Sequence, residues 1–353
     1  MNATELQARY PENLILTNGE QHASVMVFVP SFYLDEVIDG ASHTLHPAFF
    51  KNDTPQKGIY ISKFQNVVID GCAYSLPDLD PATGIDFDTA ARACANTASG
   101  AHLITAMEWG ALALWCQKND CLPYGNNGFG KDVREETVCA KISFVDQVQQ
   151  ICRTATGTGP VTWSHNRKTD GIYDLNGNVW EWNGGFRLVH GEMQVWIDTI
   201  SVCGQEAYAP TSPAWRALDG TTGEWICPNG FGTTPNSVKL DYVRGAWQYV
   251  SAPLSSMEDQ IRFAPFWETT AHPSVCQKAK EQLWALGFLP WSNRGIDHEI
   301  ALYANNGAAE RMAFRGGRWG QGLNAGLFKA CIDDPRSYTG VAVGFRSAYY
   351  HNV

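Results

Sequence analysis

The segment that most constrains this chain is residues 315–346, close to the C-terminal end. Its residues are of two kinds and follow neither a helical nor a strand period. The first kind suits tight turns and buried packing: Gly316, Gly317, Trp319, Gly322, Ala325, Gly326, Phe328, Gly344, Phe345 and Arg346. The second kind shares no chemistry: Arg318, Gly320, Gln321, Leu323, Leu327, Lys329, Cys331, Asp333, Asp334, Ser337, Tyr338 and Thr339. A rigid frame that carries arbitrary side chains is typical of a binding surface, because loops held by a scaffold carry recognition.

Composition limits the partners of this chain. The hydrophobic content of 44% and charged content of 18% over 353 residues indicate a globular protein with a large core. The net charge is −10, and no run is rich in lysine or arginine, so we expect no nucleic-acid partner. No apolar run is long enough to cross a bilayer, so we expect no membrane insertion. The first residues lack the pattern of a secretory signal peptide.

The ten cysteines form no Cys-x-x-Cys pair, so a zinc site is not expected. Without a signal peptide, reduced thiols are the simplest expectation, several of them buried as small hydrophobic side chains. Cys116 and Cys121 are close enough in sequence to form a disulfide, and the sequence leaves that choice open.

Regular elements are few. The residue patterns predict three helices, over residues 86–98, 105–119 and 274–286. Thr105 and Glu108 form a capping box at the start of the second helix, and Ser274 and Gln277 have the same arrangement in the third. Two strand regions are predicted, over residues 24–33 and 58–69. The rest is rich in glycine, asparagine and proline, and residues 120–170 and 204–310 are expected to form long ordered loops, which are usually functional.

Residues 170–182, DGIYDLNGNVWEW, have two interpretations. The carboxylates of Asp174 and Glu181 and the carbonyls of Gly177 and Val179 are spaced so that they could converge on Ca²⁺, which prefers oxygen ligands. Alternatively, the segment is a turn capped by asparagine side chains, with both of its tryptophans in the core. From spacing alone, the turn is favoured.

The same residues carry a family resemblance. GIYDLNGNVWEW closely resembles the signature of the formylglycine-generating enzyme family, also called sulfatase-modifying factors. FRGGRW at residues 314–319 and GFR at 344–346 look like the closing motifs of that family, and residues 25–32 and 59–68 are similar to its opening strands. The resemblance runs from about residue 20 to the C-terminus, with 204–310 poorly matched. In the family, a Ca²⁺ site uses the positions that match Asp174, Gly177, Val179 and Glu181.

This resemblance implies a fold and a division of the chain. The expected fold is α+β and C-type-lectin-like, of the formylglycine-generating type, irregular and loop-rich with few helices and short strands. Residues 1–19 would be an N-terminal extension. Residues 20–353 would form a single elaborated domain, with an insertion at about 204–310 and a variable ligand-binding region at about 313–346.

The departure from the family concerns catalysis. Its oxidases bind copper through a pair of cysteines near the C-terminus, because a soft metal needs two thiolates there. Between Trp319 and the end, this chain has only Cys331. The related ergothioneine-type iron enzymes need a histidine cluster, whereas the nine histidines here are scattered. We therefore expect no enzymatic activity and no required cofactor, with Ca²⁺ as a structural ion.

The layout RGGxWxxGxxAGxF…GFR resembles a non-catalytic branch, the variable proteins of diversity-generating retroelements. In these systems a reverse transcriptase copies a template with errors at adenines, so that AAC codons come to encode varied residues. Most of the residues of the second kind can be reached from AAC, whereas Gln321 and Lys329 cannot. The middle of the chain also resembles such proteins in tailed phages and prophages, where they sit at tail tips and bind the host surface.

This branch implies a hypervariable, receptor-binding function, with a protein or a glycan on a bacterial surface as the target. Leu323, Leu327 and Tyr338 would be apolar anchors, and Arg318, Asp333 and Asp334 polar selectors. The location would be a virion tail tip or a bacterial cell surface, and a tail-tip assembly would favour a homotrimer.

Two other functions stay open from the sequence. A copper-dependent oxidase acting on a cysteine of a target protein would need a second thiol near Cys331, brought there from Cys203, Cys227 or Cys276. A calcium-dependent sugar-binding lectin would need a Glu/Gln-Pro-Asn/Asp triplet, and the nearest triplets, at residues 76–78, 227–229 and 234–236, each lack the leading acid or amide.

Overall fold

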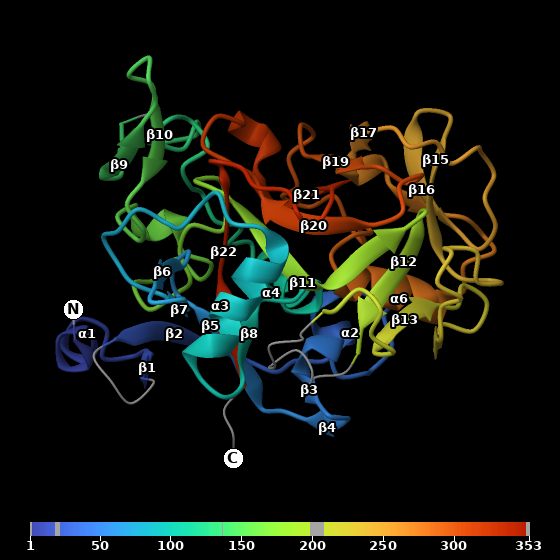
Figure 1. Ribbon diagram of the computed structural model, residues 1–353, viewed down its shortest axis with the longest axis horizontal. Coiled ribbons are helices and arrows are strands. Elements are labelled where there is room, and N and C mark those ends of the chain that lie inside the picture. The colour runs from blue at the N-terminus through green and yellow to red at the C-terminus, as the bar shows by residue number, and fades with distance from the viewer. Residues whose placement is uncertain (1, 18–21, 136, 198–207, 351–353) are drawn as a thin grey trace.

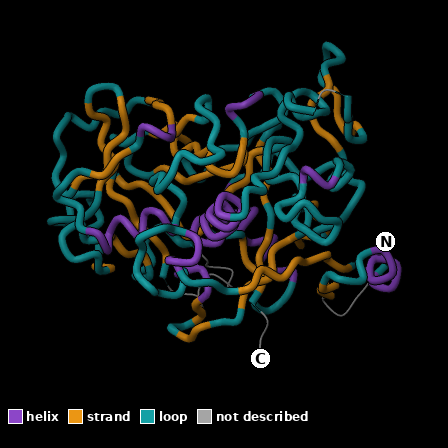
Figure 2. Tube along the Cα trace, turned by 180° about the vertical axis from the view of Figure 1, so that it is seen from behind, coloured by secondary structure: helices purple, strands orange, loops and turns teal. Residues whose placement is uncertain are grey.

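The fold is described from a computed structural model, which covers residues 2–17, 22–135, 137–197 and 208–350. It is a mixed α+β protein with 17% helix and 32% strand, as the sequence predicts. Figure 1 shows two groups of strands with a helix between them, and Figure 2 shows how much of the chain is loop. In the described part of the chain, no helix combines the length and apolarity needed to cross a membrane.

A five-stranded sheet joins the two ends of the chain. Its strands, in spatial order, are β1 (Leu14–Thr17), β2 (Ala23–Pro30), β5 (Gly58–Ser62), β23 (Ser347–Tyr349) and β8 (Ala101–Leu103). β1 pairs with β2, so residues 14–17 of the expected N-terminal extension form an edge strand of this sheet. β23 lies between β5 and β8, so the closing GFR motif leads directly into the sheet.

A twelve-stranded sheet contains the C-terminal segment. Its main path, in spatial order, is β17 (Arg262–Pro265), β19 (Ala301–Ala304), β21 (Gly326–Asp334), β20 (Arg311–Gly316), β11 (Trp180–Val189), β12 (Glu192–Trp196), β15 (Lys239–Val243), β16 (Ala246–Val250) and β18 (Thr270–Ala271). β13 (Trp215–Leu218) and β14 (Trp225–Ile226) branch from β12, and β22 (Val343–Phe345) pairs with β11. Three small two-stranded sheets are β3 (Phe50–Lys51) with β4 (Thr54–Pro55), β6 (Val67–Ile69) with β7 (Cys72–Tyr74), and β9 (Ile142–Val145) with β10 (Ile151–Thr154).

The helices are short, and one is central. They are α1 (Ala3–Arg9), α2 (Leu34–Val37), α3 (Phe87–Thr97), α4 (Ala106–Lys118) and α6 (Gln277–Ala285), with 3₁₀ turns η1 (Pro47–Phe49), η2 (Val161–Trp163), η3 (Phe266–Glu268) and η4 (Gly322–Asn324). The predicted capping box of α4 is confirmed, with Thr105 and Glu108 bonded reciprocally. Because α4 is enclosed by other elements, Trp109 and Leu112 are almost fully buried, and so is Glu108, which lies 2.9 Å from His102 Nε2.

The third predicted helix starts later than the sequence indicates. Ser274 does not cap α6, because its hydroxyl accepts from Ser251 Oγ at 2.8 Å and also contacts His272 Nδ1 at 2.9 Å. The N-cap is Cys276, whose side chain makes no capping hydrogen bond. The capping-box prediction for Ser274 and Gln277 was therefore wrong, although the helix itself is present.

The expectation of a long loop over residues 204–310 was also wrong for the described residues 208–310. This region contains α6 and the strands β13–β19. Leu218, Trp247 and Leu302 from this region share one hydrophobic core with Val27 of β2 and Leu112 of α4. The region is therefore integrated into the main core.

Candidate ligand-binding surface

The predicted frame of the C-terminal segment is confirmed. β20 turns into β21 through Gly316 and Gly317, whose φ angles of +89° and +85° favour glycine. A Cβ on Gly317 would lie 2.8 Å from the Cβ of Ala325, so a larger residue would also force the turn apart. Trp319 and Phe328 are buried. The frame is thus fixed by backbone conformation and by packing.

Two buried arginines fasten this frame to the rest of the molecule. Arg315 donates from Nη2 to the carbonyls of Gly287 at 3.0 Å and Leu327 at 3.1 Å. Its guanidinium also lies over the Phe288 ring, 4.5 Å from the centroid, and burial lowers its pKa to about 9. Arg346 holds both carboxylate oxygens of Glu181, at 2.5 and 2.6 Å. Such enclosed cations hold the segment in one position.

The first exposed part of the segment is the turn after Gly317. Arg318, Gly320, Gln321 and Leu323 are half-buried there. Gln321 Oε1 accepts from the Arg318 backbone N–H at 2.9 Å, so this side chain supports the turn from within. The Arg318 guanidinium lies 5.5 Å from the centre of the Trp319 ring.

The second exposed part follows β21. Ser337, Tyr338 and Thr339 are exposed, with Tyr338 at 37%, whereas Asp333 and Asp334 are half-buried. The Tyr338 ring stacks on Phe314 with centroids 6.3 Å apart. Burial raises the pKa of Tyr338, as do the charges of Asp334 and Asp333, while Arg318 opposes the rise. Arg318 and Tyr338 are therefore electrostatic neighbours. The two exposed parts form one surface, called here the display surface, which consists of Arg318, Gly320, Gln321, Leu323, Asp333, Asp334, Ser337, Tyr338 and Thr339.

Both acidic residues of the display surface ionise with difficulty. Burial and the charge of the neighbouring Asp333 together raise the pKa of Asp334 to about 6, against the charge of Arg311. Burial also raises the pKa of Asp333. The Oδ1 atom of Asp333 is buried and has no hydrogen-bond partner in the described structure. A cationic group of a ligand would relieve this desolvation, which suits a selector role for the two acids.

Three of the predicted display residues are not displayed. Leu327, Lys329 and Cys331 lie in β21 and are 2%, 0% and 8% exposed. β21 is covered on both faces, because Leu327 packs in the main core and Cys331 packs in a second hydrophobic cluster with Trp180 and Trp182. Lys329 Nζ donates to Asn324 Oδ1 at 2.6 Å and lies 4.1 Å from the centre of the Tyr303 ring. The prediction that these three residues face a ligand is therefore corrected.

One residue of the surface was missed by the sequence analysis. Phe129 is 40% exposed, and its backbone N–H donates to Trp319 O at 3.1 Å. Its ring covers Gly320, where a Cβ would lie 2.8 Å from the ring. The glycine-rich stretch around it, in a region expected to be a functional loop, was the available signal.

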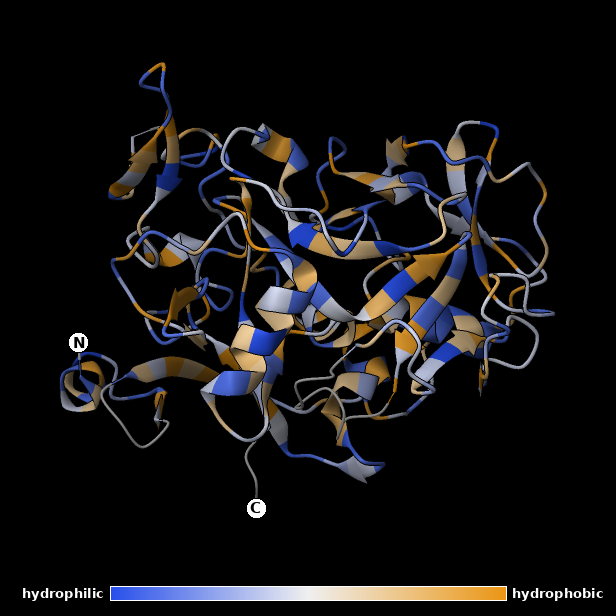
Figure 3. Ribbon diagram, viewed as in Figure 1, coloured by the Kyte–Doolittle hydropathy of each residue, from blue (hydrophilic) through white to orange (hydrophobic). Residues whose placement is uncertain are grey.

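Further apolar side chains flank the display surface. Val341 is 68% exposed, and its carbonyl accepts from Arg153 Nη1 of β10 at 2.9 Å. The Arg153 guanidinium also lies 4.1 Å from the centre of the Phe144 ring in β9. At the tip of the same hairpin, Val148 is 81% exposed. Figure 3 shows apolar residues on the hairpin that projects from the molecule.

Two of the residues predicted as calcium ligands have other partners in this structure. Arg346 holds the Glu181 carboxylate, and the Val179 carbonyl accepts from Gln65 Nε2 at 3.1 Å. The Asp174 carboxylate accepts from the Gly157 N–H through Oδ2 at 2.8 Å, while its Oδ1 is buried without a hydrogen-bond partner among the described residues. The calcium site stays a prediction, and Glu181, its second carboxylate, is already engaged by a cationic side chain.

The alternative interpretation of that motif agrees with the structure. Trp180 and Trp182 are 6% and 0% exposed, and both rings pack edge-on against Phe314. Asn178, within the turn, accepts from Thr154 N at 2.9 Å and donates to Gln65 Oε1 at 2.8 Å. The motif therefore supports the core beneath β20.

No described cysteine pairs with Cys331. Its electrostatic neighbours are Asp333, Lys329 and Asp334, and burial raises the pKa of its thiol well above the ordinary value. Cys227 and Cys276, like the other described cysteines, are free thiols, including Cys116 and Cys121. Cys203 lies outside the described residues. Nothing in this geometry favours an oxidase.

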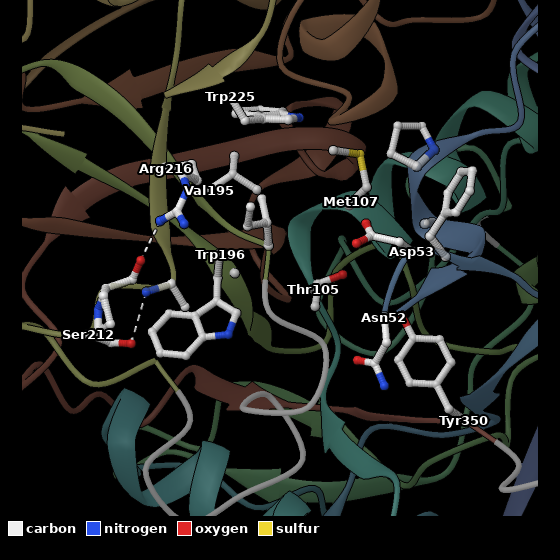
Figure 4. Close-up of a pocket in the computed structure, with 17 residues that line it drawn as sticks. Asn52, Asp53, Thr105, Met107, Val195, Trp196, Ser212, Arg216, Trp225 and Tyr350 are labelled. Atoms are coloured by element: carbon white, nitrogen blue, oxygen red, sulfur yellow. Dashed lines mark hydrogen bonds between the residues drawn. The ribbon is translucent and has the colours of Figure 1, made fainter. Parts of the chain in front are cut away.

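A cavity of about 850 Å³ lies elsewhere. Figure 4 shows it between Asn52 and Asp53 of the β3–β4 turn, Met107 of α4 and the aromatic rings of Trp196 and Trp225. The described residues that line it include none from 315 to 346. The display surface is therefore separate from this cavity.

Fold and site together define a mixed α+β protein whose C-terminal hairpin presents side chains of mixed chemistry on a fixed frame. Among solved structures, the chain is similar to Treponema denticola variable protein 1, with a TM-score of 0.36, 10% sequence identity, and coverage of 96% of this chain and 99% of that one. No protein-family model and no curated protein matches the sequence. A TM-score and a sequence identity this low show nothing about function, so the functional conclusion rests on the residues of this chain.

Proposed function

We propose that this chain is a hypervariable ligand-binding protein of the kind encoded by diversity-generating retroelements, built on a C-type-lectin-like scaffold. It performs no catalysis and requires no cofactor. The observation that carries the proposal is the separation of the C-terminal segment into a buried frame and exposed positions of unrelated chemistry. Arg318, Leu323 and Tyr338 are accessible, while Gly317 and Trp319 hold the turn.

The target that we propose is a protein on a bacterial surface. Phe129, Val341 and Tyr338 expose apolar area beside charged side chains, and an apolar centre with a polar rim is typical of protein interfaces. A glycan would favour a surface of amides and carboxylates, and it remains the alternative ligand class. Attachment to a host from a virion tail tip or a bacterial cell surface fits this function, and a trimer would add avidity.

The proposal is tested by sequencing the gene in many clones from one population. The expected result is substitution at adenine-derived codons within 318–340, with the frame codons unchanged. We also expect the range of residues to differ between positions. Exposed positions such as 318, 323 and 338 should accept any residue, whereas 327 and 331 should accept only small or apolar ones. Codons 180–196, which encode buried β11 and β12, are the internal control.

Two results would contradict this proposal. One is a population in which the display codons are as constant as the control codons. The other is flanking DNA that contains neither a reverse transcriptase gene nor a near-copy of the segment differing at adenines.

A further inference from the structure

A smaller cavity, of about 340 Å³, contains a buried lysine. It lies between the N-terminal residues 9–13 and residues 169–173, and Lys63, just after β5, lines it. The described residues that line it include none from the display surface. The Lys63 side chain is 1% exposed, so a ligand can reach its amine only through this cavity.

The hydrogen bonds of Lys63 match a neutral amine. Its Nζ donates to Thr169 O at 2.7 Å and to Gly171 O at 2.8 Å. No carboxylate lies within ion-pair distance of it among the described residues. A neutral amine has two N–H groups, and both are then satisfied, so its lone pair occupies a position not used by these carbonyls.

Aromatic rings form the remaining surroundings of this amine. The centres of the Tyr10, Tyr173 and Phe64 rings lie 5.3, 5.4 and 5.8 Å from Nζ. All three rings also line the cavity, so a flat aromatic ligand there can pack against them. The cavity therefore combines a reactive group with walls that select a ring.

Burial leaves part of the Lys63 population neutral at physiological pH. Burial lowers its pKa to about 7, and the Asp170 carboxylate only partly opposes this. Burial raises the pKa of Tyr10 to about 12 and also raises that of Tyr173, so both hydroxyls stay protonated. His165 is neutral, because burial lowers its pKa to about 4. Arg9 is paired with Asp78.

We propose that this cavity is a binding site for small aromatic aldehydes or ketones, which Lys63 holds as an imine. The Nζ lone pair attacks the carbonyl carbon, the carbon–nitrogen bond forms, and the carbonyl oxygen takes the proton that leaves nitrogen. Loss of that hydroxyl as water, with a second proton from nitrogen, gives the neutral imine. The amine and the carbonyl compound thus give the imine and one water, with no oxidant or reductant.

The test uses 4-hydroxybenzaldehyde on the full chain at pH 7, with cyanoborohydride to reduce the imine and peptide mapping by mass spectrometry. The expected result is one dominant adduct at Lys63. It should form at least about tenfold faster than adducts at exposed lysines, because a solvated lysine is almost entirely protonated at pH 7. Its rate should increase with pH through about 7. Lys63→Met should lose the adduct, and the matched variant Lys57→Met, at an exposed lysine, should keep it.

Two further measurements keep the test decisive if Lys63→Met does not fold. In the unsubstituted chain, 4-hydroxybenzyl alcohol, which has the ring but no carbonyl group, should slow labelling of Lys63 only. Unfolding in urea should abolish the preference for Lys63. Labelling spread over exposed lysines, with Lys63 unmodified, would overturn the proposal and leave Lys63 as a link between β5 and residues 169–171.

Discussion

The middle of the C-terminal segment and its two ends differ in environment although they looked alike in sequence. In the middle, Leu327 and Lys329 lie in a strand that is covered on both faces. At the ends, Leu323 and Tyr338 lie in turns and reach solvent. A residue of arbitrary chemistry can therefore be either a ligand contact or a part of the core, and the fold decides which. Substitutions in the two regions should have different effects, and those effects test the distinction.

The largest expected effect comes from the frame. Arg346→Met should lower the free energy of unfolding by about 3–5 kcal/mol, because it leaves the Glu181 carboxylate buried without its cation. Urea unfolding measures this change. Arg318→Met, at a half-buried arginine of the display surface, is the control and should change stability by about 0.5 kcal/mol or less. Equal losses in both variants would mean that the frame is not fixed by its buried arginines.

Two leucines in the segment allow a matched comparison. Leu327→Ala should cost about 2–5 kcal/mol, since it opens a cavity in the main core. Leu323→Ala, in the half-buried turn, should cost less than about 1 kcal/mol. Thermal unfolding of the two variants checks the difference. If Leu323→Ala proves as costly as Leu327→Ala, the turn is part of the core and does not belong to the display surface.

These positions also show what the sequence could and could not predict. The start of α4 was predictable because Thr105 and Glu108 act locally, three residues apart. The course of β21 was not, because a strand covered on both faces loses the alternation of apolar and polar residues. The calcium assignment could not take into account that Arg346, which is 165 residues from Glu181 in sequence, binds that carboxylate. Contacts between distant segments decide such sites, and a local pattern does not contain them.

Lys329 gives the buried middle a pH dependence of stability in the alkaline range. Burial lowers its pKa from the ordinary 10.5 to about 8. Between these two values the unfolded chain binds more protons, so stability should rise as pH increases from about 8 to 10.5, by roughly 2–3 kcal/mol from this group.

Lys329→Met should remove that contribution, which is read as the difference in urea-unfolding free energy between the variant and the unsubstituted chain at each pH. Lys57→Met, at an exposed lysine, should leave the pH dependence unchanged. A curve that is the same in all three chains would show that the Lys329 ammonium is solvated and that β21 is less covered than its geometry indicates.

The smallest effect on stability and the largest on recognition are expected at Tyr338. Tyr338→Ala removes a ring that is 37% exposed and stacked on Phe314, so its stability cost should stay below about 1 kcal/mol. Under the proposed function, adhesion of the fluorescently labelled chain to the target bacterium should nevertheless fall, because aromatic anchors carry much of the binding energy in such surfaces. Phe231→Ala, at an aromatic residue that is 74% exposed and remote in sequence, is the control and should keep adhesion. If Tyr338→Ala and Leu327→Ala lower the melting temperature equally, Tyr338 belongs with the buried middle, and the division between frame and display surface has been drawn in the wrong place.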